Sequence, residues 1–527
     1  MLDDLAAGAR LLWRLPAFLR NPVRAHGVRA ILQMRLQRRE ANFLGLAARA
    51  IYAVPTNPYR HLLAHIGCAP NDLAALVGRE GVEGALRALY RQGVYLTVDE
   101  FKGRRPVVRG NLTMTVTPGL LRNPQASVHI PVHSGGSRSP QIAAGIDLED
   151  IRAEAADLRL FLAARGGEAW VHSFWSVPGG AAMRWILRIS AAGGVPARWF
   201  SQVDPAAPGL HPRYRWSARV MRWGSLLAGT PLPAARHVSP DAPGPIVAWM
   251  ADTRRRSAVP HLLTYPSAAV RVCRAALDAG VDLSGAQFTV SGEPMTAGRL
   301  QEITRAGAAV RPVFAAMECG QIGYGCLNPE VSDDLHLATD LHAVIQAGAD
   351  GSAAGLPAEA LLVTALRPTA PFILLNVSLG DQAALVKRSC GCPLEQVGWG
   401  THLHTVRSYE KVTAGGMTFL DAEITRVLEE VLPARFGGGP TDYQLVEEEA
   451  ADGSPHLRLL VHPAVGALDE HGVADVFLSA LGAGPGAAGV MARLWRDAGV
   501  LRVERRPPRL SASGKILHRQ RVRTAGP

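Results

Sequence analysis

Two charged side chains of this 527-residue chain stand at turns where they could take part in chemistry. Lys515 lies in a turn of small residues, Ser511-Ala512-Ser513-Gly514-Lys515-Ile516, and it is one of only four lysines among 56 basic residues. A lysine is normally a solvated surface residue, but its rarity here gives this one weight. Glu318 follows an apolar run, and a carboxylate at a strand end can hold Mg²⁺ that bridges phosphates. The alternative is a solvated acid at a helix start.

A loop rich in glycine and serine is a third candidate. It runs from His133 to Pro140 after an apolar strand, so backbone N–H groups could approach phosphate oxygens without obstruction by side chains. The loop residues that would cradle a phosphate are Ser134, Gly135, Gly136, Ser137, Arg138 and Ser139. The alternative is an ordinary surface loop that binds nothing.

Further strand ends suit a nucleotide. Residues 289–296 are typical of a strand, a tight turn at Gly292-Glu293-Pro294 and a helix start, and a second strand ends near Phe314. Open α/β sheets bind ligands at such carboxyl ends, where an aromatic ring can stack on a base. Asp381, in a Gly-Asp pair at another strand end, could bind the two ribose hydroxyl groups. The alternative makes Phe314 a core residue.

Aromatic residues that follow other predicted strands could line an apolar pocket. The candidates are His172 and Trp175 in VHSFWSVPGG, together with Tyr265. An apolar, aromatic lining suits an apolar ligand. The same residues could equally belong to an ordinary core.

The elements that must position these residues alternate between helix and strand. Predicted helices cover 151–165, 181–192, 268–279 and 297–306, and predicted strands cover 169–172, 195–200, 287–291 and 310–315. This alternation predicts an α/β fold with a large N-terminal unit, in which parallel-type sheets are flanked by helices.

The two ends of the chain differ from this pattern. From Tyr409 a compact α+β pattern predicts helices at 421–431, 472–481 and 486–497 and strands near 443–448 and 456–462. The first 65 residues have helical spacing that is interrupted at Pro16 and Pro22. The predicted units are a helical extension over 1–65, a large domain over 66–408 and a small mobile domain over 409–527. The extension should cap the large domain, and contact with a membrane surface is the less favoured alternative.

Composition narrows the class of protein. The chain is 48% hydrophobic and 19% charged with six cysteines, which excludes disordered, collagen-like and disulfide-framework proteins. It lacks an apolar window of about 18 residues and a signal-like start, so we expect a cytoplasmic protein. The formal charge of +11 comes from arginines spread over the whole chain, so no nucleic-acid partner is expected.

Taken in order, the motifs resemble the acyl-adenylate-forming superfamily of ligases, most closely its phenylacetate-CoA ligase-like branch. The sequence HSGGSRSPQ at 133–141 is similar to the family's TSGTTGxPK-like loop, which binds the phosphates of ATP. Residues 291–294 are similar to a GxEP-like turn beside the adenine, and residues 314–318 to a YGxTE-like motif whose acid binds Mg²⁺. The ending SASGKILHR is similar to PSGKxxR, whose lysine bridges carboxylate and phosphate during adenylation.

Two more residues gain a role from this resemblance. Asp381 resembles the acid that holds the ribose, and Arg407 begins the segment 407–410 that resembles the hinge between the two domains. Several positions depart from the family pattern: Arg138, Gln141, Ala315, Met317 and Tyr409. Arg138 could supply the phosphate-binding charge that the family's lysine provides.

The resemblance implies a reaction. MgATP would activate a small-molecule carboxylic acid as acyl-AMP with release of pyrophosphate, and Lys515 and Glu318 would be the catalytic residues. A stretch after the strand at 169–172 lines the acyl pocket in similar enzymes, so His172, Trp175 and Tyr265 would line a pocket for an aryl or fatty acid. The acyl group would then pass to a thiol, either CoA or the phosphopantetheine of a carrier protein acting in trans. The alternatives are an amine acceptor, a protein cysteine as acceptor, or a degenerate homologue that no longer catalyses.

The resemblance also implies a zinc site. Members of the phenylacetate-CoA ligase-like branch often carry a Cys/His/C-x-C arrangement, and Cys326, His336, Cys390 and Cys392 are similar to it. Three thiolates and one imidazole would make a closed, structural Zn²⁺ site. The alternative is a set of unconnected reduced thiols. We expect Cys68, Cys273 and Cys319 to be small buried residues.

Overall fold

The computed structural model describes residues 11, 13–126, 130–133, 143–177, 180–204, 222–409, 412–414, 417–419, 421–449, 455–482, 501–511 and 514–523. A twelve-stranded sheet forms its centre. From one edge to the other, the sheet contains β13 (His342–Gln346), β14 (Ala360–Ala365), β15 (Val377–Lys387), β16 (Thr401–Ser408), β12 (Leu335–Leu337), β11 (Gly320–Gly325), β10 (Ala309–Ala316), β9 (Gln287–Ser291), β8 (Pro260–Thr264), β5 (Val171–Ser176), β6 (Pro196–Ser201) and β7 (Ala235–His237).

The sheet has a parallel half and an antiparallel half. Strands β10, β9, β8, β5, β6 and β7 pair in parallel, and the pairs from β10 to β13 are antiparallel. Parallel strands require crossover helices on both faces. The carboxyl ends of β8, β9 and β10 therefore lie together at one edge, where the α/β rule places ligands.

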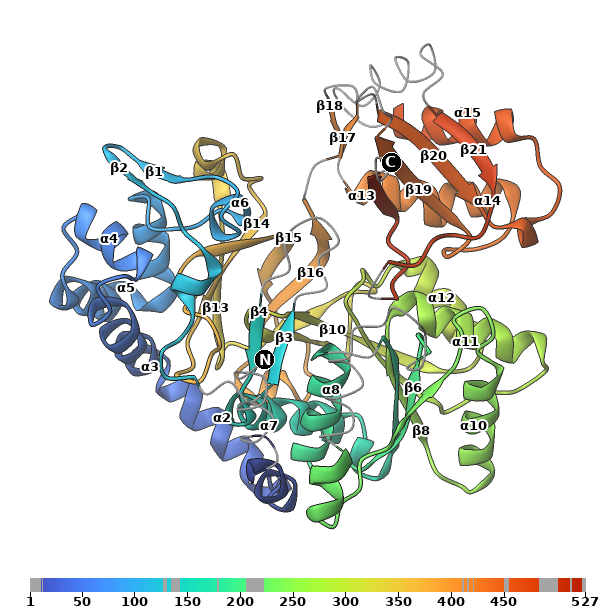
Figure 1. Ribbon diagram of the computed structural model, residues 1–527, viewed down its shortest axis with the longest axis horizontal. Helices are drawn as coiled ribbons and strands as arrows, with labels where there is room; N and C mark the ends of the chain where they lie inside the picture. Colours follow the sequence, from blue (N-terminus) through green and yellow to red (C-terminus); the bar gives the residue numbers. More distant parts are fainter. Residues whose placement is uncertain are drawn as a thin grey trace.

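Helices cover both faces of the parallel half (Figure 1). Neighbouring residues of β5 point to opposite sides, so Phe174 joins a core with α7 (Leu148–Ala164) and α8 (Gly180–Ala191), whereas Trp175 joins a core with α10 (Gly244–Arg255) and α11 (Pro266–Asp278). Helix α12 (Ala297–Arg305) packs beside α11 and against β10. The predicted α/β class is thereby confirmed.

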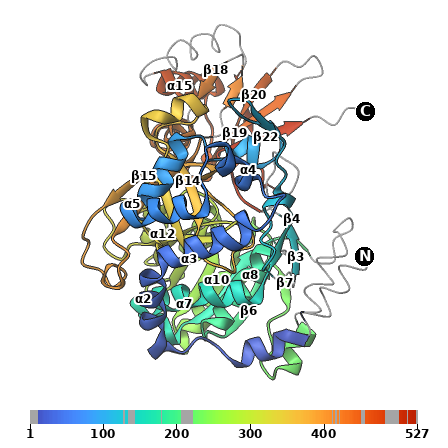
Figure 2. The same cartoon turned by 90° about the vertical axis from the view of Figure 1, so that its left-hand side faces the viewer.

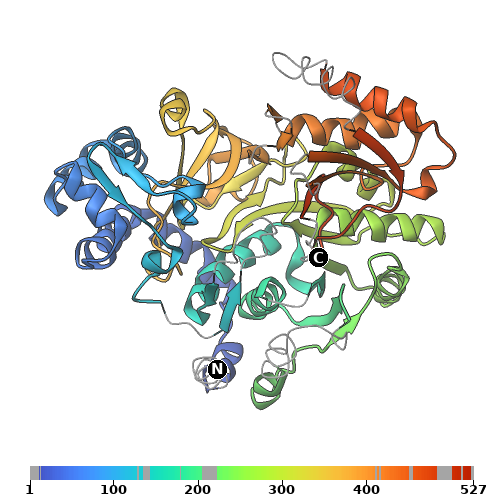
Figure 3. The ribbon, with the colours of Figure 1, turned by 45° about the horizontal axis from the view of Figure 1, so that its top comes forward.

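A smaller unit lies above α12 (Figures 1 and 3). Its sheet has the order β21 (Leu501–Arg505), β20 (Pro455–Val461), β19 (Tyr443–Glu449), β22 (Arg519–Arg523). The apolar side chains of this sheet pack on the π-helical turn η7 (Val427–Val431) and on α15 (Glu470–Gly482). Helices α13 (Asp421–Arg426) and α14 (Leu432–Phe436) flank η7, and the hairpin β17 (Val412–Ala414) and β18 (Met417–Phe419) precedes it.

N-terminal helices run along one side of the molecule (Figure 2). They are α2 (Val28–Gln37), α3 (Arg39–Leu46), α4 (Pro58–His65), α5 (Pro70–Arg91) and α6 (Val98–Phe101). Arg35 of α2 pairs with the buried carboxylates of Asp157 and Asp340 at 3.1 and 3.3 Å, which ties the helices to the central sheet. The boundaries at residues 65 and 408 stay predictions. Among the described residues, no helix is long and apolar enough to cross a membrane.

Most predicted elements agree with the structure to within a few residues. The predicted break at Pro16 is wrong, because residues 13–20 are helical through it. Leu15, Phe18 and Leu19 are buried on one face of that helix, and their burial outweighs the one backbone hydrogen bond that proline cannot donate. The helix predicted at 486–497 falls outside the described residues.

The remaining elements are β1 (Val107–Arg109), β2 (Leu112–Met114), β3 (Ile130–His133), β4 (Ala143–Ile146) and the short helices η1 (Ala25–Gly27), η2 (Ala47–Tyr52), η3 (Pro118–Leu121), η4 (Gly167–Ala169), η5 (Gly348–Ala354), η6 (Glu395–Val397) and η8 (Pro463–Val465).

Candidate active site

The turn that carries Lys515 docks on the carboxyl ends of β8 and β9 through Glu293. This buried carboxylate accepts hydrogen bonds from the N–H of Ile516 (3.0 Å) and the hydroxyl of Ser267 (2.8 Å) at Oε1. Its Oε2 accepts from the N–H of Ser267 (2.9 Å) and from the Arg299 guanidinium (2.8 Å). A fully bonded buried acid is rigid. Glu293 therefore fixes the C-terminal turn to the large domain.

The Lys515 ammonium group rests against the turn at Gly292. This glycine has φ of +83°, and a Cβ built on it would lie 2.8 Å from Lys515 Nζ. The ring centroid of Tyr265 is 5.5 Å from Nζ, within cation–π range. Burial lowers the pKa of Lys515, and the charges of Glu293 and Asp381 oppose that shift. A desolvated cation attracts an arriving anion more strongly than a solvated one.

The same turn touches the ends of β5 and β6. A Cβ built on Gly514 would overlap Gln202 Oε1 and would lie 2.7 Å from Val177 Cγ2. Gln202 is 6% exposed, and among the described residues neither of its side-chain amide atoms has a hydrogen-bond partner. Burying an amide without a partner costs free energy, so Gln202 is a candidate for binding substrate beside Lys515. No motif in the sequence pointed to it.

Glu318 lies at the same edge, one strand further along. Strands β9 and β10 pair in parallel with Ser291 opposite Val313, so the residues that follow both strands are neighbours. Phe314 is partly buried against the core, consistent with either of its two interpretations. Burial raises the pKa of Glu318, and the nearby charge of Lys102 lowers it.

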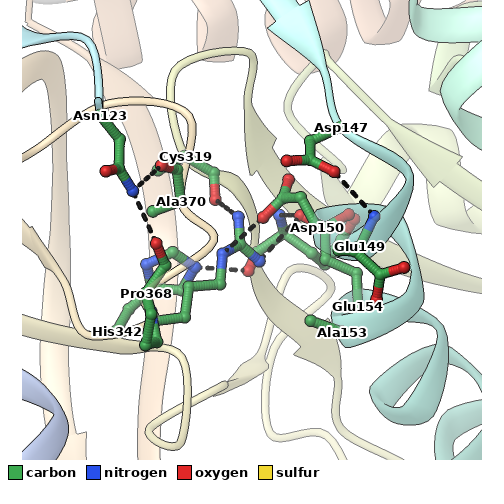
Figure 4. Close-up of polar contacts among 12 residues, drawn as sticks. Asn123, Asp147, Glu149, Asp150, Ala153, Glu154, Cys319, His342, Pro368 and Ala370 are labelled. Carbon is green, nitrogen blue, oxygen red and sulfur yellow. Dashed lines mark hydrogen bonds and ion pairs between the residues drawn. The ribbon is translucent and has the colours of Figure 1, made fainter. Parts of the chain in front are cut away.

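A buried network of ion pairs holds the turn that follows Glu318 (Figure 4). Arg367 donates to the Cys319 carbonyl at 2.7 Å, and Glu154 Oε1 accepts from the Gln321 N–H at 3.2 Å. A Cβ on Gly320 would overlap Glu154 Oε1, so this position must be glycine. The turn is therefore built around the carboxylate of Glu154.

Arginines balance the charges of this network. Arg184 binds Asp150 at 2.8 Å, Arg188 lies 3.1 Å from Glu154, and Arg367 lies 2.9 Å from Asp150 and 3.1 Å from Glu154. Burial alone would raise the pKa of Glu154, but the three arginines lower it. Because all five side chains are buried, the network resists displacement of the turn. No local motif in the sequence indicates this network.

Asp381 and Arg407 lie on the neighbouring strands β15 and β16. Asp381 pairs in register with Ser408, and its charge reaches Lys515. The Arg407 guanidinium forms an ion pair with Asp333 at 2.7 Å. Tyr409, where the family usually has an acid, shares a hydrogen bond of 2.6 Å with the Ser378 hydroxyl. The segment 407–410, predicted to be a hinge, is thus bonded to the central part of the molecule up to Tyr409.

A second buried cluster, which we call the latch, joins the two domains. Arg299 of α12 is fully buried and contacts Glu429 of η7 at 2.8 Å. Glu429 also accepts a hydrogen bond from the Thr296 hydroxyl and pairs with His518, whose Nε2 lies 3.2 Å from Arg299 Nη2. These four residues form the latch. Together with Glu293, it holds the small domain in the orientation that brings Lys515 to the strand ends.

The remaining predicted residues are more scattered. Residues 134–139 lie outside the described residues, so their phosphate-binding role stays a prediction. His172 is buried, with Nδ1 2.8 Å from His261 Nδ1, and burial lowers its pKa to about 4. Trp175 is buried and donates to the Val238 carbonyl at 3.1 Å, in the core against which Tyr265 packs. The structure thus brings Tyr265, but not His172, to Lys515.

The four predicted zinc ligands lie close together in the antiparallel half of the sheet. The ligand atoms of Cys326, His336, Cys390 and Cys392 all lie within 4.8 Å of one another. His336 Nε2 is 3.1 Å from Cys392 Sγ and 3.5 Å from Cys390 Sγ, and Nδ1 is 2.6 Å from the Trp399 carbonyl. A proton on Nδ1 would leave Nε2 free to bind a metal. The donor set therefore fits a tetrahedral Zn²⁺ ion.

Of the other cysteines, Cys273 and Cys319 are buried as predicted, and Cys68 is partly exposed.

Comparison with known proteins identifies the fold. No protein-family model matches the sequence, and no curated protein matches it significantly. Two structures of 2-hydroxyisobutyryl-CoA ligase in the postadenylation state, bound to R3-HIB-AMP and to 2-HIB-AMP, are similar, each with a TM-score of 0.53. Their sequence identities are 16% and 15%, and each match covers 95% of this chain and 90% of the ligase. The chain therefore has the fold of an acyl-adenylate-forming ligase, whereas the phenylacetate-CoA ligase-like branch stays a prediction.

Proposed function

We propose that this protein activates a carboxylic acid with MgATP as acyl-AMP, releases pyrophosphate, and transfers the acyl group to a thiol. The observation that carries the proposal is the docking of the Lys515 turn onto Gly292 and Glu293 at the ends of parallel strands. A partly buried lysine at this edge, beside Asp381 and Tyr265, suits a substrate that carries phosphate and carboxylate groups. The acid would be aryl or aliphatic.

In the first half-reaction, a carboxylate oxygen attacks the α-phosphorus of ATP and the bond to the β-phosphate oxygen breaks. Lys515 would neutralise negative charge that builds up between the carboxylate and the α-phosphate. Asp381 would bind the ribose hydroxyl groups, and the Gly292 turn would leave room for the adenine. Mg²⁺, bound by Glu318, would neutralise charge on the departing pyrophosphate.

In the second half-reaction, the thiol of CoA or of a phosphopantetheinyl carrier attacks the acyl carbon and AMP leaves. The Lys515 ammonium group lies against the strand ends, so the small domain would have to withdraw before a thiol could reach the adenylate. The proposed hinge is the segment 407–410. We also propose that Cys326, His336, Cys390 and Cys392 bind a structural Zn²⁺, apart from the reaction.

Pyrophosphate release tests this function. We expect one class of acid, from a panel of aryl, medium-chain and long-chain acids, to give acid-dependent release from MgATP. Lys515→Ala should lower that release by at least about a hundredfold, because the lysine acts on the charge that develops in the transition state. Adding CoA should raise turnover if CoA is the acceptor.

A matched control uses another of the chain's few lysines. Lys387→Ala, at the end of β15, removes the same charge away from the Gly292 turn and should keep wild-type activity. ATP binding without pyrophosphate release from any acid would contradict the proposal and favour a degenerate homologue that only binds nucleotide.

A further inference from the structure

The most exposed apolar side chains of the described residues gather at one end of the molecule. Trp13 is 86% exposed, Val195 74%, Leu227 68% and Trp223 67%, and no other large apolar side chain of the described part exceeds 53%. Leu226, on the same short helix as Trp223, is 48% exposed. Scattered apolar residues on a surface need no explanation, but four extreme cases at one end do.

Hydrogen bonds join the segments that carry these residues. Arg20, on the helix that carries Trp13, donates to the Leu227 carbonyl at 2.8 Å and to the Ala228 carbonyl at 3.1 Å. The N–H of Val23 donates to the Ala191 carbonyl at 2.7 Å, at the end of α8 that leads to Val195. The helix at residues 13–20, the helix at 222–227 and the end of α8 thus share one end of the large domain.

The charges around these side chains are positive. Arg14 and Arg20 are exposed on the helix at residues 13–20, Arg222 is exposed on the helix at 222–227, and Arg24 and Arg29 are exposed shortly after the first of these helices. Among the described residues, none of the five forms an ion pair, and Arg20 binds only neutral carbonyl groups. One acid, Glu149, lines the groove beside Trp13. Exposed tryptophan and leucine among arginines are suited to the boundary between lipid headgroups and acyl chains.

The position of this end fits an anchoring role. Figure 1 shows the N-terminal helix (dark blue) and the neighbouring green helix at the bottom, whereas the small domain with β19, β20 and α15 lies at the top. A flat surface that contacted the lower end would leave the small domain free to move. Access to the strand ends that carry Lys515 would also stay open.

From these observations we propose that the surface formed by Trp13, Val195, Trp223, Leu226 and Leu227, with its arginines, docks on anionic lipid membranes. The rings would enter the headgroup region while the guanidinium groups bind lipid phosphates. The interaction is peripheral, because no described helix can cross a bilayer. This inference does not depend on the proposed enzymatic function.

Vesicle sedimentation of the full chain tests the inference. Wild-type protein should sediment with phosphatidylcholine vesicles that contain phosphatidylglycerol, and binding should weaken as salt is raised. The double variant Trp13→Ala, Trp223→Ala should lose at least about tenfold in partition coefficient, because each ring supplies buried apolar area. The double variant Arg14→Gln, Arg24→Gln should lose the preference for the anionic lipid.

Matched control variants distinguish binding by this surface from nonspecific hydrophobic binding. Val108→Ala with Val386→Ala removes exposed apolar groups elsewhere and should sediment like wild type. Brominated lipid should quench tryptophan emission in wild type and much less in the tryptophan double variant. The inference is overturned if wild type does not sediment, or if the tryptophan variant sediments equally. Concentration-dependent self-association that the tryptophan variant abolishes, without vesicle binding, would also overturn it and assign the surface to contact between copies.

Discussion

At Gly292 the backbone turns with φ of +83° directly beside the Lys515 ammonium group. Two separate structural constraints apply to this position. The left-handed conformation disfavours any residue with a Cβ, and a methyl group would fit only if the end of the Lys515 side chain moved away. The GxEP-like turn therefore does more than end a strand, because it also sets how closely the lysine can approach.

We expect Gly292→Ala to lower acid-dependent pyrophosphate release by about a hundredfold, because the new methyl group would displace Lys515 Nζ from the site. Gly285→Ala is a matched control for backbone strain. Its φ is +82°, and a Cβ built on it would meet no atom within 4 Å, so it should cost stability of about 1 kcal/mol without a comparable loss of rate. Equal loss of rate in both variants would show that strain, and not the lysine contact, decides the effect.

Sequence reasoning finds some site residues and cannot find others. Lys515, Glu293 and Asp381 stand in short motifs whose glycines and strand ends are visible locally. Arg299 and Gln202 stand in no such motif. Arg299 belongs to the site because it contacts His518, which lies 219 residues further along the chain. Gln202 belongs to the site because it contacts Gly514. Partners so distant in sequence become visible only when the chain is folded.

At the scale of elements, the cysteine and histidine cluster joins three segments of the antiparallel half of the sheet. Cys326 follows β11, His336 lies in β12, and Cys390 and Cys392 lie in the loop between β15 and β16. Strand β12 has only three residues and pairs over short stretches with β11 and β16, so side-chain links around it would add to the stability of this pairing. A bound metal would hold the three segments together.

We expect purified protein to contain close to one zinc ion per chain, measured by elemental analysis, and Cys392→Ser to lose it. Removing zinc with a chelator should lower the melting temperature, because metal binding contributes to folding free energy. Cys68→Ser, at a partly exposed cysteine outside the cluster, should keep both metal content and melting temperature. Metal-free protein whose melting temperature does not change with added zinc would contradict this site.

The alternation of helices and strands explains why the fold class could be predicted from the sequence. The helix predicted at 297–306 corresponds to α12, and the strand predicted at 287–291 corresponds to β9. Both could be predicted because turn residues separate helix-like and strand-like segments of typical length. The order of strands in the sheet was not predictable in the same way. Strand β12 pairs with β16, far along the chain, and that pairing depends on side chains such as His336 and His402 that face each other across it.

At the scale of the whole molecule, the orientation of the small domain depends on few contacts. Glu293 binds the N–H of Ile516, and the latch joins α12 to η7 and His518. Arg274 adds an ion pair with Asp442 at 2.9 Å. Separating the buried pairs of the latch would leave buried charges without their partners, which is costly, so these contacts favour the observed arrangement. The latch should therefore set the balance between the two proposed half-reactions.

We expect Glu429→Gln to slow acyl-adenylate formation by about tenfold, because it removes the charge that pairs with both Arg299 and His518. Thiol transfer from preformed acyl-AMP should change much less, since that step requires the small domain to withdraw. Glu430→Gln, at the exposed neighbouring residue, is the matched control and should leave both half-reactions unchanged. Small-angle scattering should report a larger radius of gyration for Glu429→Gln than for Glu430→Gln. If adenylation and thiol transfer fall by the same factor, Glu429 acts through general stability and not through the orientation of the small domain.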